Sequence, residues 1–228
     1  RSAACVSYAK QLEIDVSFGM AASGRVDPAL EEDVYRAAAE AGAGRFYMYD
    51  GAGVQIPEAM AYCVRRLRDI VGPGPELAVH CHNDFGMAVA NTIAGALAGA
   101  QYLSTTINGL GERCGNASLE EVVMAIRVLY DLDLGINTTA LCALCRDAEA
   151  RSGVRLAVNK PIAGRDAFTH ETGMSVAGVL NNPFAAEAYS PSFVGQTRSI
   201  VLGKKSGKAS VEFKLQQLGL SVKKEALN

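Results

Sequence analysis

The sequence predicts an α/β fold in which parallel strands alternate with helices. Three observations carry this prediction. Strand-like and helix-like segments recur about every 30 residues, glycine and proline clusters separate them, and polar residues gather just after the strand-like segments. With 228 residues, 49% of them hydrophobic, the chain is long enough for one large domain or two smaller ones. A parallel sheet with helices outside it is the expected arrangement.

The first two βα units occupy residues 13–71. Glu13–Phe18 alternates polar and apolar residues and predicts a strand. An Asp-Pro pair then supplies an N-cap and a first-turn proline for a helix over Leu30–Ala41, which a glycine ends. Arg45–Asp50 predicts the second strand, and the apolar spacing of Pro57–Val71 predicts the second helix.

Two more βα units follow. Leu77–His82 predicts the third strand, and the small residues of Met87–Leu97 predict a buried helix. Tyr102–Ile107 predicts the fourth strand, and Ser118 begins a helix that runs to Tyr130. Because sequential parallel strands are usually neighbours, we expect these four strands side by side in chain order.

The pattern changes after residue 130. Residues 131–182 mix helix and loop, and a glycine- and lysine-rich segment, LGKKSGK, lies at 202–208. We therefore expect a partial barrel or sheet over residues 1–130 and a linker with a small helical subdomain over residues 131–228. Polar groups at the carboxyl ends of parallel strands are typical of a (β/α)8 barrel or of a doubly wound sheet.

Composition argues against several kinds of partner. The formal net charge is −2, so no basic excess indicates nucleic acid or an anionic membrane. No apolar run reaches transmembrane length and no signal-peptide pattern opens the chain, so a cytoplasmic protein is expected. The six cysteines lie within predicted helices and strands, which indicates reduced, packed thiols.

The segment His80-Cys81-His82-Asn83-Asp84 is the clearest candidate for chemistry. Side chains alternate along a strand, so His80 and His82 point to the same face. Two imidazoles on one face at the end of a strand are suitable ligands for a divalent metal. The alternative is that both are polar strand-end residues, bonded to backbone or water.

Several segments of the chain resemble those of a known enzyme family. VHCHNDFGMAVANT and TTINGLGERCGNASLEEVVMAI resemble the signature region of the 2-isopropylmalate, homocitrate and citramalate synthase family. Its carboxyl-terminal subdomain is resembled by three later segments, VNKPIAG, FTHETGMSVAGVL and SIVLGKKSGKASV. Within the family, the sequence most resembles homocitrate synthases, including the nitrogen-fixation type. The resemblance implies the second half of a metal-dependent (β/α)8 TIM barrel, followed by a small helical subdomain.

The resemblance also implies an activity. Family members are acyltransferases that join an acyl-CoA, here expected to be acetyl-CoA, to a 2-oxo acid in a Claisen-type condensation and then hydrolyse the thioester. His80, His82 and Asn116 would bind a divalent metal, Mg²⁺, Mn²⁺ or Zn²⁺. The alternative for Asn116 is an N-terminal helix cap.

Three further residues are candidates for contacting the substrate. Arg113 and Glu112 lie in the Gly-rich loop of the signature. We expect each of them either to contact substrate or to order the loop. A buried structural ion pair is equally compatible with the sequence. Asp50, at the end of a strand, bonds either to substrate or to a neighbouring strand end.

The acid/base groups of the family are not conserved in this sequence. By the resemblance, its acidic pair falls on Ala21 and Ala22, its subdomain histidine on Ser175, and the partner tyrosine on Ala186. The threonine after the sixth-strand aspartate is likewise replaced, by a glycine. His170 and Tyr189 are the nearby imidazole and phenol, and the catalytic candidates are these two or a residue of the first half of the barrel. The alternative for His170 is a structural bond to backbone.

The resemblance places the start of this chain near the fifth of eight barrel strands. We therefore expect either a homo-oligomer or a partner chain that supplies the first half of the barrel, unless the sequence is truncated or its reading frame incomplete. Small molecules are the expected substrates. Two other functions stay open: a divergent aldolase or lyase on the same metal site, and a non-catalytic chain that needs a partner.

Overall fold

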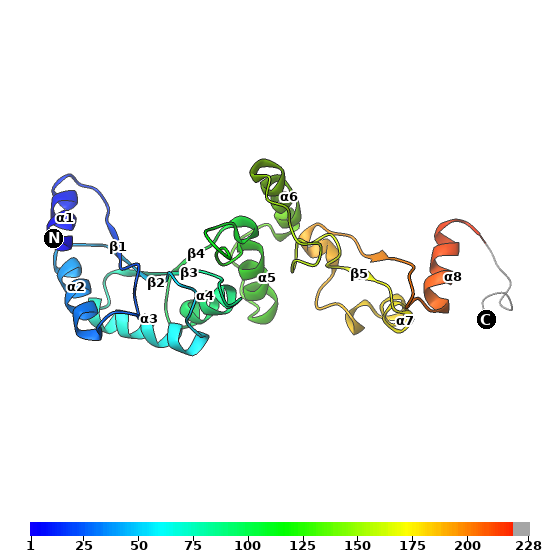
Figure 1. The fold of residues 1–228 in the computed structure, drawn as a ribbon, viewed down its shortest axis with the longest axis horizontal. Coiled ribbons are helices and arrows are strands. Elements are labelled where there is room, and N and C mark those ends of the chain that lie inside the picture. Colours follow the sequence, from blue (N-terminus) through cyan, green and yellow to red (C-terminus); the bar gives the residue numbers. More distant parts are fainter. Residues whose placement is uncertain (221–228) are drawn as a thin grey trace. The chain divides into compact units, whose positions relative to one another are not determined.

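The computed structural model describes residues 1–220, and the chain divides into two compact units at Val122 and Val123. In Figure 1 the first unit is drawn from blue to green and the second from green to red. No helix in this described part has the length and apolar character needed to cross a membrane. The domain boundary expected after residue 130 stays a prediction.

A four-stranded parallel sheet forms the centre of the first unit. Its strands follow chain order: β1 (Ser17–Gly19), β2 (Arg45–Asp50), β3 (Glu76–Cys81) and β4 (Tyr102–Ser104). Three helices link the strands and pack along the same side of the sheet (Figure 1): α2 (Pro28–Glu40), α3 (Pro57–Val71) and α4 (Ala88–Leu97). Helix α1 (Ser2–Gln11) precedes the sheet and α5 (Leu119–Leu129) follows it. The predicted α/β class, strand order and parallel pairing are confirmed.

Two expected strands are shorter than predicted. The expectation for Glu13–Phe18 is wrong over its first four residues, because the turn that ends α1 takes in Glu13 and the strand begins only at Ser17: the Glu13 N–H donates to the Lys10 carbonyl at 3.0 Å and Glu13 has a φ of 58°. The fourth strand ends at Ser104 rather than Ile107. There the chain turns away into the short 3-10 helix η1 (Ile107–Gly109).

The side chains of strand β2 alternate between the two faces of the sheet. Phe46 and Met48 are buried on the side that the helices cover. Tyr47 and Tyr49 lie half-buried on the opposite side, where their rings stack with centroids 5.3 Å apart. The Tyr49 ring also meets the His80 ring edge-on at 5.4 Å. The side away from the helices therefore carries an aromatic pair next to a candidate metal ligand.

Gly19 leaves the space that this aromatic pair occupies. A Cβ atom on Gly19 would overlap Cε2 of Tyr49 and would lie 2.8 Å from Cβ of Tyr47. Gly19 is the register partner of Tyr47, so the clash would occur inside the sheet itself. The position of the Tyr49 ring thus depends on the absence of a side chain on the neighbouring strand.

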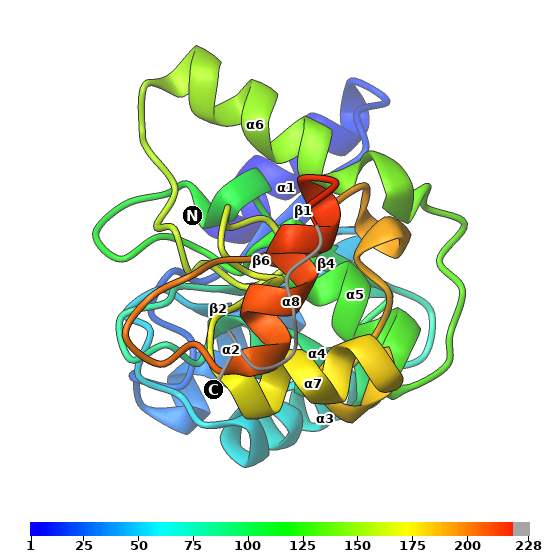
Figure 2. The ribbon, with the colours of Figure 1, turned by 90° about the vertical axis from the view of Figure 1, so that its right-hand side faces the viewer.

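After α5, the second unit contains a short parallel ribbon and further helices. The ribbon pairs β5 (Thr169–His170) with β6 (Ser199–Ile200). Its helices are α6 (Leu141–Ser152), α7 (Gly173–Asn181) and α8 (Lys208–Gln217), with 3-10 turns η2 (Thr138–Ala140), η3 (Pro183–Ala185) and η4 (Pro191–Val194) between them. Figure 2 shows α7 and α8 against each other. Its core is apolar: Leu141, Cys142, Cys145, Phe168, Val176, Val179, Val194 and Ile200.

Replacing Gly19 by alanine should destabilise the first unit by about 1–3 kcal/mol, the usual result of forcing a methyl group into filled space. Gly44→Ala is the matched control: a Cβ there would meet nothing within 4 Å, so we expect a change within about 0.5 kcal/mol. Urea unfolding of the two variants measures both effects. Equal stability of the two variants would contradict the proposed packing.

Candidate active site

His80 and His82 converge at the carboxyl end of β3. His80 is in the strand and His82 follows it, so the strand alternation places both side chains on one face. The two Nε2 atoms are 3.2 Å apart, and the ring centroids are 5.0 Å apart. The expected convergence of the two imidazoles is therefore present in the fold.

Asn116 lies opposite His82. The two residues form an antiparallel bridge, flanked by bonds from Asn83 N to Gly115 O at 2.9 Å and from Ala117 N to Cys81 O at 3.1 Å. These bonds leave His82 and Asn116 as a non-hydrogen-bonded pair, the kind whose side chains share a face and approach most closely. The loop after β4 thus places the Asn116 side chain on the same face as that of His82.

These three residues fit a divalent ion. Two nitrogen atoms 3.2 Å apart both lie within ligand distance, about 2.0–2.2 Å, of a common point. The Oδ1 atom of Asn116 is buried without a hydrogen-bond partner among the described residues, as is Nδ1 of His82. A buried amide oxygen without a donor is a suitable hard ligand. Within residues 1–220 no cluster of three or more His, Cys, Asp or Glu side chains has metal-binding geometry.

Ser104 orients the first imidazole. Its hydroxyl lies 3.0 Å from Nδ1 of His80, on the neighbouring strand β4. When Nδ1 carries the proton and donates to this hydroxyl, Nε2 is left with its lone pair toward His82. Burial lowers the pKa of His80, and the adjacent His82 lowers it further. The neutral imidazole, which is the metal-binding form, is therefore favoured.

Arg113 forms hydrogen bonds that connect the loops near His80, His82 and Asn116. Its guanidinium donates to both carboxylate oxygens of Asp84, at 2.8 and 3.0 Å, and to the Gly51 carbonyl at 2.7 Å. These bonds join the loops that follow β2, β3 and β4, and the Arg113 guanidinium lowers the pKa of Asp84. The pair is partly exposed, with 44% of the Arg113 side chain accessible, so it is not the buried ion pair considered from sequence. Glu112 is exposed on the same loop, and contact of either residue with substrate stays a prediction.

Asp50 is buried at the end of β2, with its carboxylate bonded to protein donors. Val54 N donates to Oδ1 at 3.0 Å and Gln55 N donates to Oδ2 at 3.1 Å. The carboxylate therefore shapes the turn that leads to α3. A substrate contact for Asp50 stays a prediction.

His170 belongs to a charged cluster in the second unit. Its Nε2 lies 3.1 Å from Oε1 of Glu187, a buried carboxylate. Arg198 donates to both oxygens of the same carboxylate, at 2.7 and 2.6 Å. The bond that the structure shows for the His170 ring is to a side chain, and both a catalytic role and a structural role, as a cap or a bond to backbone, stay predictions. Because the carboxylate holds Nε2, Nδ1 is the nitrogen that can accept a proton.

Tyr189 lines the same cavity as His170. This cavity has a volume of about 310 Å³, and Lys160, Phe168, Ala186 and Glu187 also line it. The Tyr189 ring packs edge-on against Phe168 with centroids 5.6 Å apart, and burial raises its pKa to about 12. The phenol therefore stays protonated at neutral pH. The two catalytic candidates thus share one cavity, which Ala186 also lines.

Three residues of these clusters were missed from the sequence. Ser104 contacts His80 across strands, Glu187 contacts His170 from a distant segment, and Tyr49 packs on His80. The only signal for Tyr49 was the strand alternation of RFYMYD, which places it on the face of Tyr47. The pairing of Glu187 with His170 depends on tertiary folding and leaves no local pattern.

Comparison with known sequences matches both units. The HMGL-like family matches residues 1–147, and the homocitrate synthase post-HMGL domain-like family matches residues 162–228. The homocitrate synthase of Methanopyrus kandleri is 46% identical over 225 residues, which cover 99% of this chain and 56% of that protein. A probable 2-isopropylmalate synthase of Ignicoccus hospitalis is 43% identical over 219 residues, 96% of this chain and 55% of the relative. The chain spans about half the length of the curated relatives it matches.

Solved structures agree on the fold. Hydroxymethylglutaryl-CoA lyase from Pseudomonas aeruginosa superposes with a TM-score of 0.56 at 26% identity, covering 73% of this chain and 58% of that one. The chain forms part of the TIM-barrel fold of these relatives, as the sequence predicted.

Removing both imidazoles should abolish metal binding. We expect the double variant His80→Ala, His82→Ala to bind no Mn²⁺ or Zn²⁺ at this site, and Asn116→Ala to bind about tenfold more weakly, because one oxygen ligand is lost. Calorimetric titration and metal analysis after dialysis measure both. His170→Ala is the control and should leave binding unchanged. Unchanged metal content in the double variant would contradict the site.

Glu187→Gln should destabilise the second unit at neutral pH. Arg198 lowers the pKa of Glu187 most, burial opposes this, and His170 lowers it further. A carboxylate with a depressed folded-state pKa contributes stability above its ordinary pKa and loses it as the pH falls through the folded value. We therefore expect a loss of about 2–3 kcal/mol at pH 7, because one partner of a buried pair is removed while Arg198 keeps access to water.

The difference between wild type and Glu187→Gln should shrink as the pH falls toward 3, in thermal or urea unfolding. Glu212→Gln, an exposed carboxylate on α8, should match wild type throughout. A difference that grows on acidification would show that the sign assigned to Glu187 is wrong.

Proposed function

This chain belongs to the HMGL-like family, and we propose that it is part of an acyltransferase that condenses an acyl-CoA, acetyl-CoA in the simplest case, with a 2-oxo acid. One observation supports the proposal: two imidazoles converge, with Asn116 bridged opposite His82, in a chain 46% identical to a homocitrate synthase. In this reaction the acyl α-carbon loses a proton and bonds to the keto carbon, and the keto oxygen gains a proton. Water then cleaves the thioester and CoA leaves as the thiol.

His80, His82 and Asn116 would hold the divalent ion. When bound, the ion would polarise the keto group and stabilise negative charge that develops on its oxygen. The chain's own residues keep this arrangement in place: Ser104 fixes the ring of His80, and the Arg113–Asp84 pair fixes the loop that carries Asn116. Fixed ligands lower the reorganisation needed during the reaction.

His170 and Tyr189 would transfer the protons. With Nε2 held by Glu187, Nδ1 of His170 is the basic atom, and the carboxylate stabilises the imidazolium that forms on protonation. Tyr189, still protonated at neutral pH, would donate to the developing oxyanion or leaving group. Both side chains line the cavity where the family's tyrosine is replaced by Ala186.

Further strands would complete the barrel. Among the described residues, β1 and β4 each pair with a single neighbour and form the edges of the sheet. Open parallel edges are sites of pairing with other strands. We propose that another part of the protein, a partner chain or a second copy supplies them.

A lyase reaction is the second candidate. Hydroxymethylglutaryl-CoA lyase of Pseudomonas aeruginosa, which shares 26% identity and the fold, is named as a lyase rather than as a synthase. The same metal ligands and the same acid/base pair would serve cleavage of a 2-hydroxy acid or its CoA ester. The two candidate functions differ in the direction of the reaction: condensation joins the two substrates, and the lyase reaction cleaves the product.

The complete protein should release free CoA from acetyl-CoA in the presence of a 2-oxo acid, lose this activity on chelation, and regain it with Mn²⁺ or Zn²⁺. A thiol-release assay over a panel of 2-oxo acids measures this, beside a reverse assay for cleavage. Metal binding without turnover in either direction would contradict both enzymatic functions.

His170→Gln should lower kcat by about 10²–10⁴-fold, the usual loss when a general base is removed. Tyr189→Phe should lower it by a similar or smaller factor. Ser175→Ala is the matched control, because the family's histidine would fall at this position, and it should change kcat little. If Ser175→Ala is as damaging as His170→Gln, the proton-transfer role of His170 is wrong.

A further inference from the structure

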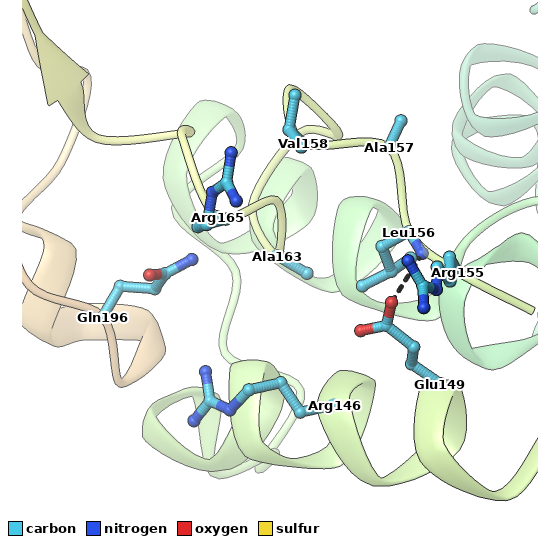
Figure 3. Close-up of a pocket in the computed structure, with 9 residues that line it drawn as sticks. All are labelled: Arg146, Glu149, Arg155, Leu156, Ala157, Val158, Ala163, Arg165 and Gln196. Carbon is cyan, nitrogen blue, oxygen red and sulfur yellow. Dashed lines mark hydrogen bonds between the residues drawn. The ribbon is translucent and has the colours of Figure 1, made fainter. Parts of the chain in front are cut away.

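A second cavity in the second unit is rich in arginine. It has a volume of about 500 Å³ and lies between α6, the loop over residues 155–165 and the segment after η4. Arg146 on α6, and Arg155 and Arg165 on the loop, reach its rim from three different places (Figure 3). Leu156, Ala157, Val158 and Ala163 form an apolar wall between them.

Two of the three guanidinium groups are not paired. Among residues 1–220, the side chains of Arg146 and Arg155 make no ion pair or hydrogen bond, whereas Arg165 pairs only with its neighbour Asp166, at 3.2 Å. Arg151, on the same helix as Arg146, is by contrast paired with Asp147 at 2.7 Å. The charge gathered at this cavity is therefore available to a ligand.

The acidic residue of the lining is already bonded to the backbone of the loop. Oε1 of Glu149 accepts a bond from the Leu156 N–H at 3.0 Å, the bond drawn in Figure 3. With three arginines and one glutamate, the lining keeps a formal charge of +2. A dianion would balance it.

The loop is held in shape before any ligand binds. Nε2 of Gln196 donates to the Gly164 carbonyl at 3.0 Å, and Asp166 N donates to Val158 O at 2.8 Å. A side chain on Gly164 would lie 2.6 Å from backbone atoms of Lys160 and Val158, so the loop depends on glycine there. Preorganised loops bind ligands at lower entropic cost.

From these features we infer that the cavity binds the phosphates of an adenosine nucleotide. Guanidinium groups match phosphate oxygens in bidentate geometry, and separate arginines suit phosphates at separate positions of one ligand. The apolar wall suits the face of a base, and cavities of about 300–1,000 Å³ hold ligands of this size. The nucleotide is either the 3′-phospho-ADP end of the acyl-CoA, which rests on the proposed function, or a free nucleotide.

Adenosine 3′,5′-bisphosphate is the probe. In calorimetric titrations of the full chain it should bind, and the double variant Arg146→Gln, Arg155→Gln should bind at least tenfold more weakly, because charge-assisted bonds to phosphate are lost. Arg151→Gln, an already paired arginine on the same helix, is the matched control and should bind as wild type does. Arg146→Lys with Arg155→Lys should restore part of the affinity, since the charge returns without the bidentate fork.

Kinetics of the complete protein distinguish the two sources of the nucleotide. If the cavity holds the CoA end, the glutamine variant raises KM for acetyl-CoA at unchanged kcat and leaves KM for S-acetylpantetheine, which has no nucleotide, as it was. If the cavity takes a free nucleotide, both KM values stay unchanged while binding of the probe is lost. The inference is overturned if the wild type does not bind the probe, or if the double variant binds it equally well. A wild type that is inactive but still binds the probe contradicts the proposed function alone.

Discussion

The pairing of residues 81–83 with residues 115–117 is the interaction on which the arrangement of the proposed metal ligands depends. Strand β3 alone would present two imidazoles and no third ligand. Without this pairing, nothing would hold the loop after β4 so that Asn116 lies near the two imidazoles. Two backbone bonds fix the register, and that register decides that the Asn116 side chain meets His82 rather than pointing to the other face. A slip by one residue would remove the amide from the site.

The sequence predicted the parts of the fold whose signals are local. β2 and α3 have the predicted boundaries, because alternation and a proline start are both clear there. β1 was predicted too long, since the polar–apolar alternation of residues 13–16 does not reveal the turn that ends α1. His80 and His82 were predictable because strand alternation is a local rule. Contacts between distant segments, such as Glu187 with His170, were not, because no local pattern encodes them.

The two parts of the proposed site are under different constraints. Metal ligands need a fixed spacing, and here a strand and a paired loop provide it. A proton-transfer group needs only reach and a partner that orients it, so several positions around one cavity serve equally. The cavity that His170 and Tyr189 share is also lined by Ala186, three residues before Tyr189 in the sequence. Substitution at the family's positions is thus compatible with retained chemistry.

The partner of each imidazole matches the role proposed for it. Both His80 and His170 have one ring nitrogen engaged by a neighbouring side chain, which directs the other nitrogen to the site. For His80 the partner is the neutral hydroxyl of Ser104, and burial lowers the pKa, so the ring stays neutral and keeps a lone pair for a metal. For His170 the partner is the carboxylate of Glu187, anchored by Arg198, which stabilises the positive charge that a proton acceptor gains. A neutral partner suits a ligand and an anionic partner suits a base, so the two environments support different roles for the same side chain.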